Sequence, residues 1–309
     1  MRGINPGILL AMAMAMQGCF TGVESTPRIS YTESKADTKA RTSPERSLLA
    51  GISRQEPAKW QPGKRFYVTD SKISIIFTPQ ASEAADNLFG KEITYHGIVP
   101  ALSVTGEPAS DVVFMSPSGQ RLSYRVNYSR DTLLTRRTLD IPFTVEMSVV
   151  DSVAEKIRGK QYYITTPLWY DGIGSQPADG LRHIPVEIES VLPGNTVFPL
   201  RVVFHPLGGT ALYSVYMSIG DQRTATRNFD TLFSITDPRT LYPRISDETW
   251  NLIVHSRVKD GMTRDECRLA LGAPRTIGQR PTRGGMVEYW SYDDGLYLIF
   301  EDGLLTTHR

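Results

Sequence analysis

The sequence lacks the features that mark several large classes of protein. Its two cysteines, Cys19 and Cys267, are too few for a framework of disulfides, so stability must come from hydrophobic cores. No apolar run reaches the roughly 20 residues that a membrane-spanning helix needs, so we predict that the mature chain does not span a membrane. The formal net charge is +1, with both signs interspersed along the chain, which argues against nucleic acid as a partner.

Patterns of common catalytic and metal sites are also missing. None of the five histidines has the spacing of a metal-ligand pair, and neither G-x-S-x-G nor a phosphate-binding fingerprint occurs. Cys267 falls on the apolar face of an expected short helix, which favours packing over nucleophilic chemistry. The neighbouring carboxylates Asp293-Asp294 and Glu301-Asp302 each precede a glycine and indicate turns. We therefore predict no enzyme activity, no cofactor and no metal ion. The alternative is a hydrolase whose catalytic residues converge from distant positions.

The N-terminus carries the order of a secretion signal over residues 1–18. Arg2 precedes an apolar run at residues 7–16, and Gly18 lies directly before Cys19. This order resembles the lipobox of bacterial lipoproteins. The resemblance implies that the signal is removed and that Cys19 is lipidated, and acyl chains of this kind hold a protein at a membrane. The alternative is ordinary cleavage after Ala13-Met14-Ala15, which leaves Cys19 as a free thiol.

The residues that follow Cys19 bear on the location of the protein. Many lipoproteins that are exported to the cell surface carry acidic residues just after the lipidated cysteine, whereas here Glu24 is the first charged residue. By this comparison we expect a lipid anchor in the outer membrane, with the periplasmic side favoured over the cell surface. Residues 19–59 are rich in Ser, Thr, Pro and charge, so we predict a lipidated N-terminus followed by a flexible tether.

The middle of the chain, from residue 60 to residue 240, has the pattern of an all-β region. Short alternating or β-branched runs are separated there by Gly, Pro, Asn and Asp. The region also repeats itself: PGKRFYVT, from Pro62, matches RGKQYYIT, from Arg158. In an ungapped register of ninety positions, Val113, Phe114, Gly119, Leu122, Arg137, Asp140 and Phe143 match Val203, Phe204, Gly209, Leu212, Arg227, Asp230 and Phe233. We predict two tandem β-modules, residues 60–150 and 156–240, each a small barrel or sandwich.

The last segment, residues 245–309, has the pattern of a small ααβββ domain. Ser246 is the expected N-cap of a first helix, and Thr263 with Glu266 forms the capping box of a second. Three strands, MVEYWSY, LYLIF and LLTTH, follow and are joined by two Asp-Gly turns. The predicted fold class is therefore mainly β, with a small α+β domain at the C-terminus.

This segment resembles the SmpA/OmlA (BamE-like) family of outer-membrane lipoprotein domains, which includes the small lipoprotein of the β-barrel assembly machinery. The residues that carry the likeness are Gly261, Met262, Thr263, Glu266, Leu271, Gly272, Pro274, Trp290, Tyr292, Gly295, Phe300 and Gly303. Cys267 departs from the family, which usually has an aliphatic residue there. The resemblance implies the ααβββ fold and a place among envelope lipoproteins, with a link to outer-membrane assembly or integrity.

The functional predictions follow from this architecture. We expect a non-catalytic cell-envelope lipoprotein that binds or scaffolds an envelope protein and contacts the membrane through its N-terminal lipid. The alternative is a glycan- or peptide-binding lipoprotein that uses the β-modules, with Trp169 and Tyr170 as candidate ligand-binding aromatics. Because neighbouring residues of a strand point to opposite faces, a core aromatic beside a surface one is the competing interpretation of this pair. Inhibition of a secreted enzyme is a further alternative, based on similarity of the C-terminal fold to β-lactamase inhibitor proteins.

Overall fold

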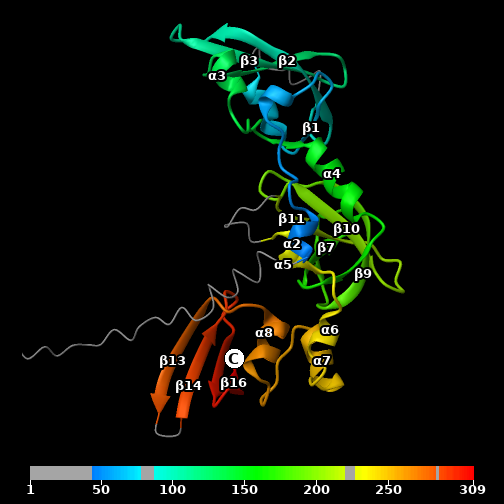
Figure 1. The fold of residues 1–309 in the computed structure, drawn as a ribbon, viewed down its shortest axis with the longest axis vertical. Coiled ribbons are helices and arrows are strands. Elements are labelled where there is room, and N and C mark those ends of the chain that lie inside the picture. Colours follow the sequence, from blue (N-terminus) through cyan, green and yellow to red (C-terminus); the bar gives the residue numbers. More distant parts are fainter. Residues whose placement is uncertain (1–43, 78–86, 220–226, 283–284) are drawn as a thin grey trace, which may run out of the picture. The chain divides into compact units, whose positions relative to one another are not determined.

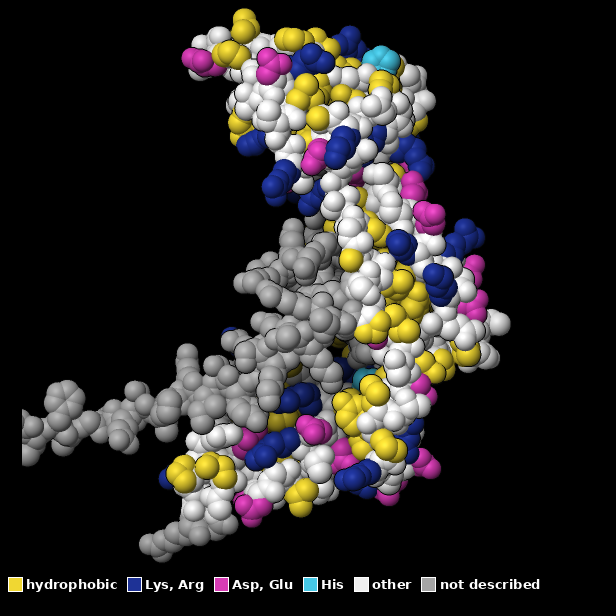
Figure 2. Space-filling model, viewed as in Figure 1, with side chains coloured by type: hydrophobic (Ala, Val, Ile, Leu, Met, Phe, Trp, Pro, Cys, Tyr) yellow, Lys and Arg dark blue, Asp and Glu magenta, His cyan; other side chains and the backbone are white. Residues whose placement is uncertain are grey.

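The structure is a computed structural model that describes residues 44–77, 87–219, 227–282 and 285–309, all within one compact unit, Ala40–Arg309. The protein is mainly β, as predicted, with three antiparallel sheets that each cover a separate hydrophobic core (Figure 1). None of the described helices is both long enough and apolar enough to cross a membrane. On the face shown in Figure 2, side chains of both charge signs are interspersed.

The first sheet has five strands in the order β4-β3-β2-β1-β5. Its alternating residues point into one core, in which Phe66, Phe114 and Tyr95 are buried with edge-on ring contacts. Helix α3 lies over β2 and β3 and is N-capped by Ser129. The elements of this part are η1 (Pro57–Lys59), β1 (Arg65–Val68), η2 (Ser71–Ile76), β2 (Glu92–Leu102), β3 (Pro108–Met115), β4 (Arg121–Val126), α3 (Arg130–Leu134) and β5 (Thr144–Glu146).

The second sheet has seven strands in the order β12-β6-β9-β10-β11-β7-β8. Helix α4 (Met147–Ile157) packs on β9, and its buried face belongs to the core of this sheet. The other elements are β6 (Gln161–Ile164), β7 (Leu168–Asp171), β8 (Pro177–Asp179), β9 (Ile184–Pro193), β10 (Leu200–Pro206), β11 (Tyr213–Met217), α5 (Phe229–Leu232) and β12 (Phe233–Ser234).

The two sheets match strand by strand. The order β4-β3-β2-β1-β5 corresponds to β11-β10-β9-β6-β12, and β7-β8 is an addition that extends the second sheet beyond β11. Each copy also has a β-bulge at the same place: Phe114 pairs with Tyr95, and its counterpart Phe204 pairs with Ile188, with a register shift next to each. A shared strand order and a shared bulge support the interpretation of two copies of one module.

The ungapped register of ninety positions, in contrast, holds for Phe114 of β3 and Phe204 of β10 and fails after these two strands. Phe114 pairs with Leu122, but Phe204 pairs with Tyr213, so the hairpin of the second copy is one residue longer. Leu122 is 1% exposed and Leu212 is 47% exposed, which shows that they are not equivalent. The matches of Arg137, Asp140 and Phe143 with the residues ninety positions later also disagree with the strand pairing. Val68 of β1 and Ile164 of β6 are equivalent residues of the repeated segment. Val68 pairs with Thr144 and Ile164 pairs with Phe233, so the counterpart of Thr144 lies 89 positions later and not 90.

Two predicted segments differ from the structure. Helix α4 crosses the end of the first predicted module, where we expected almost no helical structure. It was missed because its valines are typical of strands, although Met147, Val150, Val153 and Ile157 have helical spacing and are buried. Residues 44–59, predicted to be part of a flexible tether, are ordered. They include α2 (Pro44–Leu48) and η1, and Leu48, Leu49 and Ile52 pack against the second core. We call residues 44–55 the strap.

The C-terminal part contains α6 (Pro238–Leu241), α7 (Asp247–Val254) and α8 (Arg264–Leu271), followed by β13 (Thr276–Thr282), β14 (Gly285–Ser291), β15 (Tyr297–Glu301) and β16 (Leu304–His308). Both predicted caps are confirmed: Ser246 accepts from Thr249 N at 3.2 Å, and Thr263 forms a reciprocal capping box with Glu266. The sheet has four strands and not three. Edge strand β13 was missed because every residue in it is exposed and it contains Pro281, so it has no apolar alternation.

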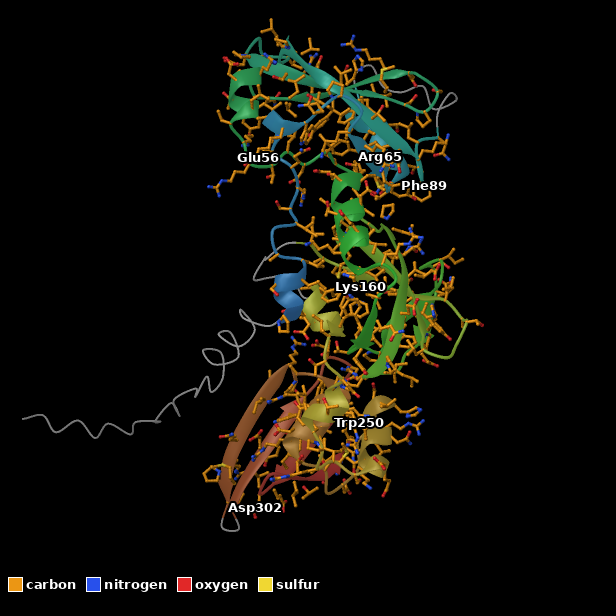
Figure 3. The ribbon with its side chains drawn as sticks, turned by 45° about the vertical axis from the view of Figure 1, so that its right-hand side comes forward. Glu56, Arg65, Phe89, Lys160, Trp250 and Asp302 are labelled. Carbon is orange, nitrogen blue, oxygen red and sulfur yellow. The ribbon has the colours of Figure 1, made fainter. Side chains whose placement is uncertain are left out.

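Arg182 and His183 join the second sheet to the C-terminal part. The Arg182 guanidinium donates to Leu271 O at 3.2 Å, Ser256 Oγ at 3.1 Å and Thr165 O at 3.0 Å, and burial lowers its pKa to about 10. His183 Nε2 donates to Leu269 O at 3.0 Å, and burial lowers the pKa of this imidazole. Trp250 of α7 (Figure 3) lies beside the His183 ring, with the two centroids 5.7 Å apart. The C-terminal part is thus joined to the second sheet by partly buried hydrogen bonds.

We predict that the lengthened hairpin of the second copy is visible in stability measurements. Leu122→Ala removes a fully packed side chain and should lower the free energy of unfolding by about 2–5 kcal/mol. Leu212→Ala, its match in the ungapped register, should change it by no more than about 0.5 kcal/mol because the side chain is half exposed. Urea denaturation followed by circular dichroism measures both. Equal losses for the two variants would contradict the register described above.

Candidate functional site

The candidate site is a cleft of ≈ 590 Å³ at the junction of the two β-modules, which we call the junction cleft. One wall is the segment that leads through β5 into α4, and the other is the hairpin loop between β9 and β10. The lining residues are Arg54, Phe66, Leu139, Asp140, Ile141, Pro142, Phe143, Thr144, Val145, Glu146, Val149, Thr196, Val197, Phe198, Pro199, Ser218 and Ile219. Its volume lies in the range of ligand-binding pockets, roughly 300–1,000 Å³.

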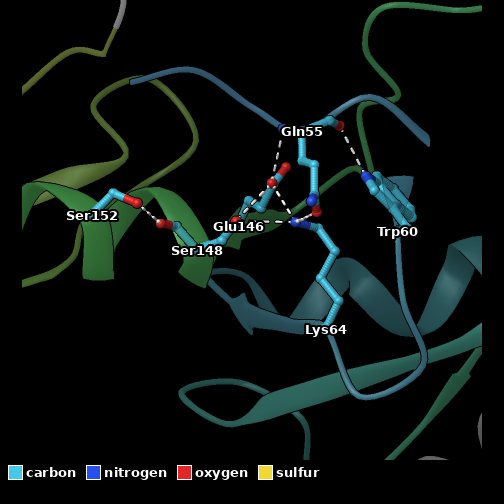
Figure 4. Close-up of polar contacts among 6 residues, drawn as sticks. All are labelled: Gln55, Trp60, Lys64, Glu146, Ser148 and Ser152. Atoms are coloured by element: carbon cyan, nitrogen blue, oxygen red, sulfur yellow. Dashed lines mark hydrogen bonds and ion pairs between the residues drawn. The ribbon is translucent and has the colours of Figure 1, made fainter. Parts of the chain in front are cut away.

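A buried ion pair holds the base of the junction cleft. Lys64 Nζ donates to Glu146 Oε1 at 2.5 Å, and the two side chains are 6% and 5% exposed (Figure 4). Lys64 Nζ also donates to Gln55 Oε1 and to Ser148 Oγ, each at 3.0 Å. Gln55 N and Ser148 Oγ donate to Glu146 Oε1 at 3.1 and 2.8 Å. Because hydrogen bonds surround both charges, we interpret the pair as structural.

This network gathers groups from three separate segments of the chain. Lys64 comes from the turn before β1, Glu146 from the end of β5 at the start of α4, and Gln55 from the strap. The carboxylate also lies at the N-terminus of α4, where the helix dipole favours negative charge. A second link crosses the junction nearby, where Arg65 of β1 (Figure 3) donates to Asp151 of α4 at 2.8 Å. The two modules are therefore fixed to each other through α4.

Phe143, on the wall of the junction cleft, has a strained backbone. Its φ of 62° is unusual for a bulky side chain and costs on the order of 1–3 kcal/mol. The surrounding structure holds it there, since Phe143 O accepts hydrogen bonds from Thr69 N at 2.9 Å and Thr69 Oγ1 at 3.0 Å. The conformation places a half-buried aromatic ring at the cleft. Strain of this kind is found at binding sites more often than elsewhere.

The opposite wall is a loop that exposes apolar side chains. Val197 is 71% exposed, and the half-buried Phe198 ring lies 5.6 Å from the Arg227 guanidinium. The Asn195 side chain accepts from Val197 N at 2.9 Å and from Phe198 N at 2.8 Å, which fixes the loop. The loop therefore presents Val197 and Phe198 in one defined conformation.

At the mouth of the cleft, Arg54 of the strap forms an ion pair with Asp140. Both side chains are partly exposed, so the pair itself contributes little stability, but it supplies one donor and one acceptor group beside the apolar walls. This arrangement of walls with apolar and polar groups and a charged mouth suits the binding of an apolar side chain together with neighbouring backbone groups.

The structure separates the two candidate aromatics. Trp169 is 3% exposed, its Nε1 donates to Thr166 O at 2.7 Å, and its ring packs edge-on against Phe204 at 5.1 Å. The hypothesis that Trp169 binds a ligand at the surface is therefore wrong, because β-strand alternation sends this side chain into the core. Tyr170 is half-buried and packs against Tyr216. Neither Trp169 nor Tyr170 lines the junction cleft.

The other sequence candidates are placed as follows. Cys19 lies outside the described residues. Cys267 is fully buried, and burial raises the pKa of its thiol to about 12, so the sulfur stays protonated and serves packing. Asp302 and Gly303 both have positive φ, as their tight turn requires. Asp293 pairs with Arg275 at the other turn. In the part of the chain that the structure describes, no group of three His, Cys, Asp or Glu side chains could hold a metal ion.

Sequence reasoning missed the residues of the junction cleft. One local signal was present: the segment LPGNTVFPL has Gly-Asn between two prolines and a Val-Phe pair with no alternation, which indicates a rigid turn with exposed apolar residues. Comparison of the chain with known protein families and with curated protein sequences gives no match.

We predict that the buried Lys64–Glu146 pair is strongly coupled. Lys64→Met or Glu146→Gln alone leaves one buried charge without its partner and should lower the free energy of unfolding by about 3–5 kcal/mol. The double variant should lose less than the sum of the two single variants. Lys160→Met is the matched control, because Lys160 occupies the same place in the repeated segment RGKQYYIT but is exposed (Figure 3). Urea denaturation measures all four, and additive losses would contradict the pairing.

Proposed function

We propose that this protein is a lipid-anchored, non-catalytic binding protein of the bacterial cell envelope that takes a peptide segment of a partner protein into the junction cleft. The junction cleft is the observation that carries the proposal. It combines a volume of ≈ 590 Å³, two walls that carry both apolar and polar groups, and a mouth with both charge signs. Peptides match this chemistry because their apolar side chains alternate with backbone donors and acceptors.

A peptide is favoured over a glycan as the ligand. The burial of Trp169 removes one of the two aromatic residues that were candidates for binding a glycan or a peptide at the surface. In the junction cleft the aromatic side chains are Phe66, Phe143 and Phe198, and none of these phenyl rings offers a hydrogen-bond donor to sugar hydroxyls. A short segment in a cleft of this size buries less area than a standard protein interface, so the binding is expected to be weak and reversible.

The proposed anchor is Cys19, which the order Gly18-Cys19 after an apolar run makes similar to a lipidated cysteine. The C-terminal part, which resembles SmpA/OmlA domains in its sequence signals, supports an envelope location on the periplasmic side of the outer membrane. In this proposal at most about 90 Å of chain separates Cys19 from Pro44, the first residue of α2, as set by the length of an extended chain. That chain length sets the greatest possible distance between the lipid and α2.

We predict that Cys19 carries the lipid. Cells grown with labelled palmitate should incorporate the label into the wild-type protein, which should sediment with the outer-membrane fraction. The variant Cys19→Ser should carry no label and should be recovered from the soluble periplasm, whereas Cys267→Ser should behave as the wild type. A wild-type protein without label, or free in the periplasm, would remove the anchor from the proposal.

We also predict that the partner is captured at the junction cleft. A photo-crosslinking amino acid at Val197 should give discrete adducts with an envelope protein in living cells. The same amino acid at Val104 is the matched control, because Val104 is also an exposed apolar residue in a β-hairpin but is remote in sequence from the cleft walls and does not line the cleft.

A bulky residue at the lip of the cleft should block this capture. Thr196 is exposed and lines the cleft, so Thr196→Trp should abolish the adducts formed from position 197. Thr105→Trp, in the hairpin of the first module, should leave them unchanged. Adducts that are equal at positions 197 and 104, or that survive Thr196→Trp, would argue against the junction cleft as the binding site.

A further inference from the structure

The strap binds the second module although it precedes the first module in the sequence. Helix α2 packs on α5, and Leu48, Leu49 and Ile52 are half-buried against the second core. Glu45 fixes the N-terminal end of the strap. Its Oε1 accepts from Ile235 N at 3.0 Å and from Ser234 Oγ at 3.4 Å. Glu45 thereby supplies an acceptor just beyond the end of edge strand β12.

These four contacts have a regular spacing. Glu45 is followed by apolar residues three, four and seven positions later, at Leu48, Leu49 and Ile52. Within α2 this spacing places Glu45 and Leu48 on one face, and Leu49 and Ile52 follow in the turn after the helix. The strap therefore binds the module in the way that a short amphipathic peptide binds a groove, with one acidic contact and three apolar ones.

The fit between the strap and the module is incomplete. A cavity of ≈ 430 Å³ lies between strap residues and the side chains of Val153, Leu200, Ile219 and Phe229. The cavity is open to solvent, so the strap covers this surface without filling it. In the described part of the chain the strap joins no sheet, and its contacts with the second module are made by side chains.

The cavity beneath the strap is next to the junction cleft. Both are lined by Ser218 and Ile219, and they meet where the strap runs from Ser53 to Arg54. The strap thus lines both hollows, with Arg54 at the junction cleft and the residues before it at the cavity. At its far end it also enters the buried network, since Gln55 N donates to Glu146.

We propose that the surface beneath the strap is a second peptide-binding site, which the strap occupies in cis and from which a partner segment of the same pattern displaces it. That pattern is an acidic residue followed by apolar residues at the third, fourth and seventh positions. The external ligand rests on the proposed binding function, whereas the occupation in cis rests on the contacts of Glu45, Leu48, Leu49 and Ile52 alone.

Occupation in cis makes the site selective. A segment attached by a short linker competes at an effective concentration in the millimolar range, so weak ligands do not displace it. Displacement also changes the reach of the protein. Freeing the ten residues 44–53, with Gln55 still held in the buried network, would add up to about 35 Å of chain between the N-terminal segment and the modules. Binding at this site is therefore coupled to the distance between the modules and the N-terminal end of the chain.

The test uses a fluorescent synthetic peptide of residues 42–56 as the probe and the full chain as the receptor. In the variant Leu48→Ser/Ile52→Ser, the weakened strap should leave the site open, and binding of the peptide measured by fluorescence anisotropy should be at least tenfold tighter than to the wild type. The control Leu168→Ser/Ile173→Ser makes the same chemical change at exposed residues on or beside β7 and should bind as the wild type does. A peptide with Leu48→Ser and Leu49→Ser should not bind the open variant.

A second measurement uses the wild-type protein, so that it does not depend on the folding of a variant. A large excess of the unlabelled peptide should increase the hydrogen-exchange rate of the Ala50 and Ile52 amides several-fold, because these N–H groups are bonded within the ordered strap. Equal binding to the open variant and its control, or exchange rates that the peptide does not change, would overturn the proposal. Because the probe is the chain's own segment, such a failure is distinct from a failure to capture a partner at position 197.

Discussion

The buried ion pair between Lys64 and Glu146 is the interaction on which the arrangement of the two modules depends. Burial of two charges is unfavourable unless they are paired and their remaining hydrogen-bonding groups are satisfied. Here that condition is met only when the turn before β1, the start of α4 and the strap are all in place, because each supplies a partner. The pair therefore stabilises one arrangement of the modules by making departures from it costly. Arg182 has a comparable role at the second junction, with neutral acceptors.

Because the junction is fixed, the junction cleft keeps one shape and can act as a preformed binding site. The walls belong to different modules, so they would separate if the modules moved independently. With the junction fixed, Phe143 and the Asn195-anchored loop are already ordered before a ligand arrives. A preformed site loses less conformational entropy on binding, and this allows a small contact area to give a useful affinity. The strap is part of the same arrangement, because Gln55 bonds to the buried pair and the strap residues before it line the cavity on the second module.

Local signals in the sequence predicted local structure well. Both helix caps and the two Asp-Gly turns of the C-terminal part depend on a few adjacent residues, and they are found where they were expected. The alternation of strand residues also predicted a buried and a less buried member of the pair Trp169-Tyr170. Helix α4 was missed because its valines favour strands whereas its packing selects a helix. Edge strand β13 was missed because its exposed residues show no apolar alternation.

The candidate site could not be predicted, because it depends on contacts between distant positions. Lys64 and Lys160 occur in the same repeated motif, yet the first side chain is buried and the second is exposed. The difference comes from α4 and Glu146, which lie 82 residues beyond Lys64 in the chain. Nothing in the local sequence distinguishes the two lysines. The strap was likewise assigned to a tether, since its few apolar residues find their partners some 180 residues away, around α5 and β12.

The most direct test of this account is a distance between spin labels on the two modules. Labels at the exposed residues Asp131 and Ser175, in a chain in which Cys19 and Cys267 are replaced by Ser, report the relative position of the first and second sheets. Pulsed electron paramagnetic resonance should give one narrow distance distribution, which should broaden in Glu146→Gln. A broad distribution in the chain that retains Glu146 would show that the modules move independently and that no preformed junction cleft exists.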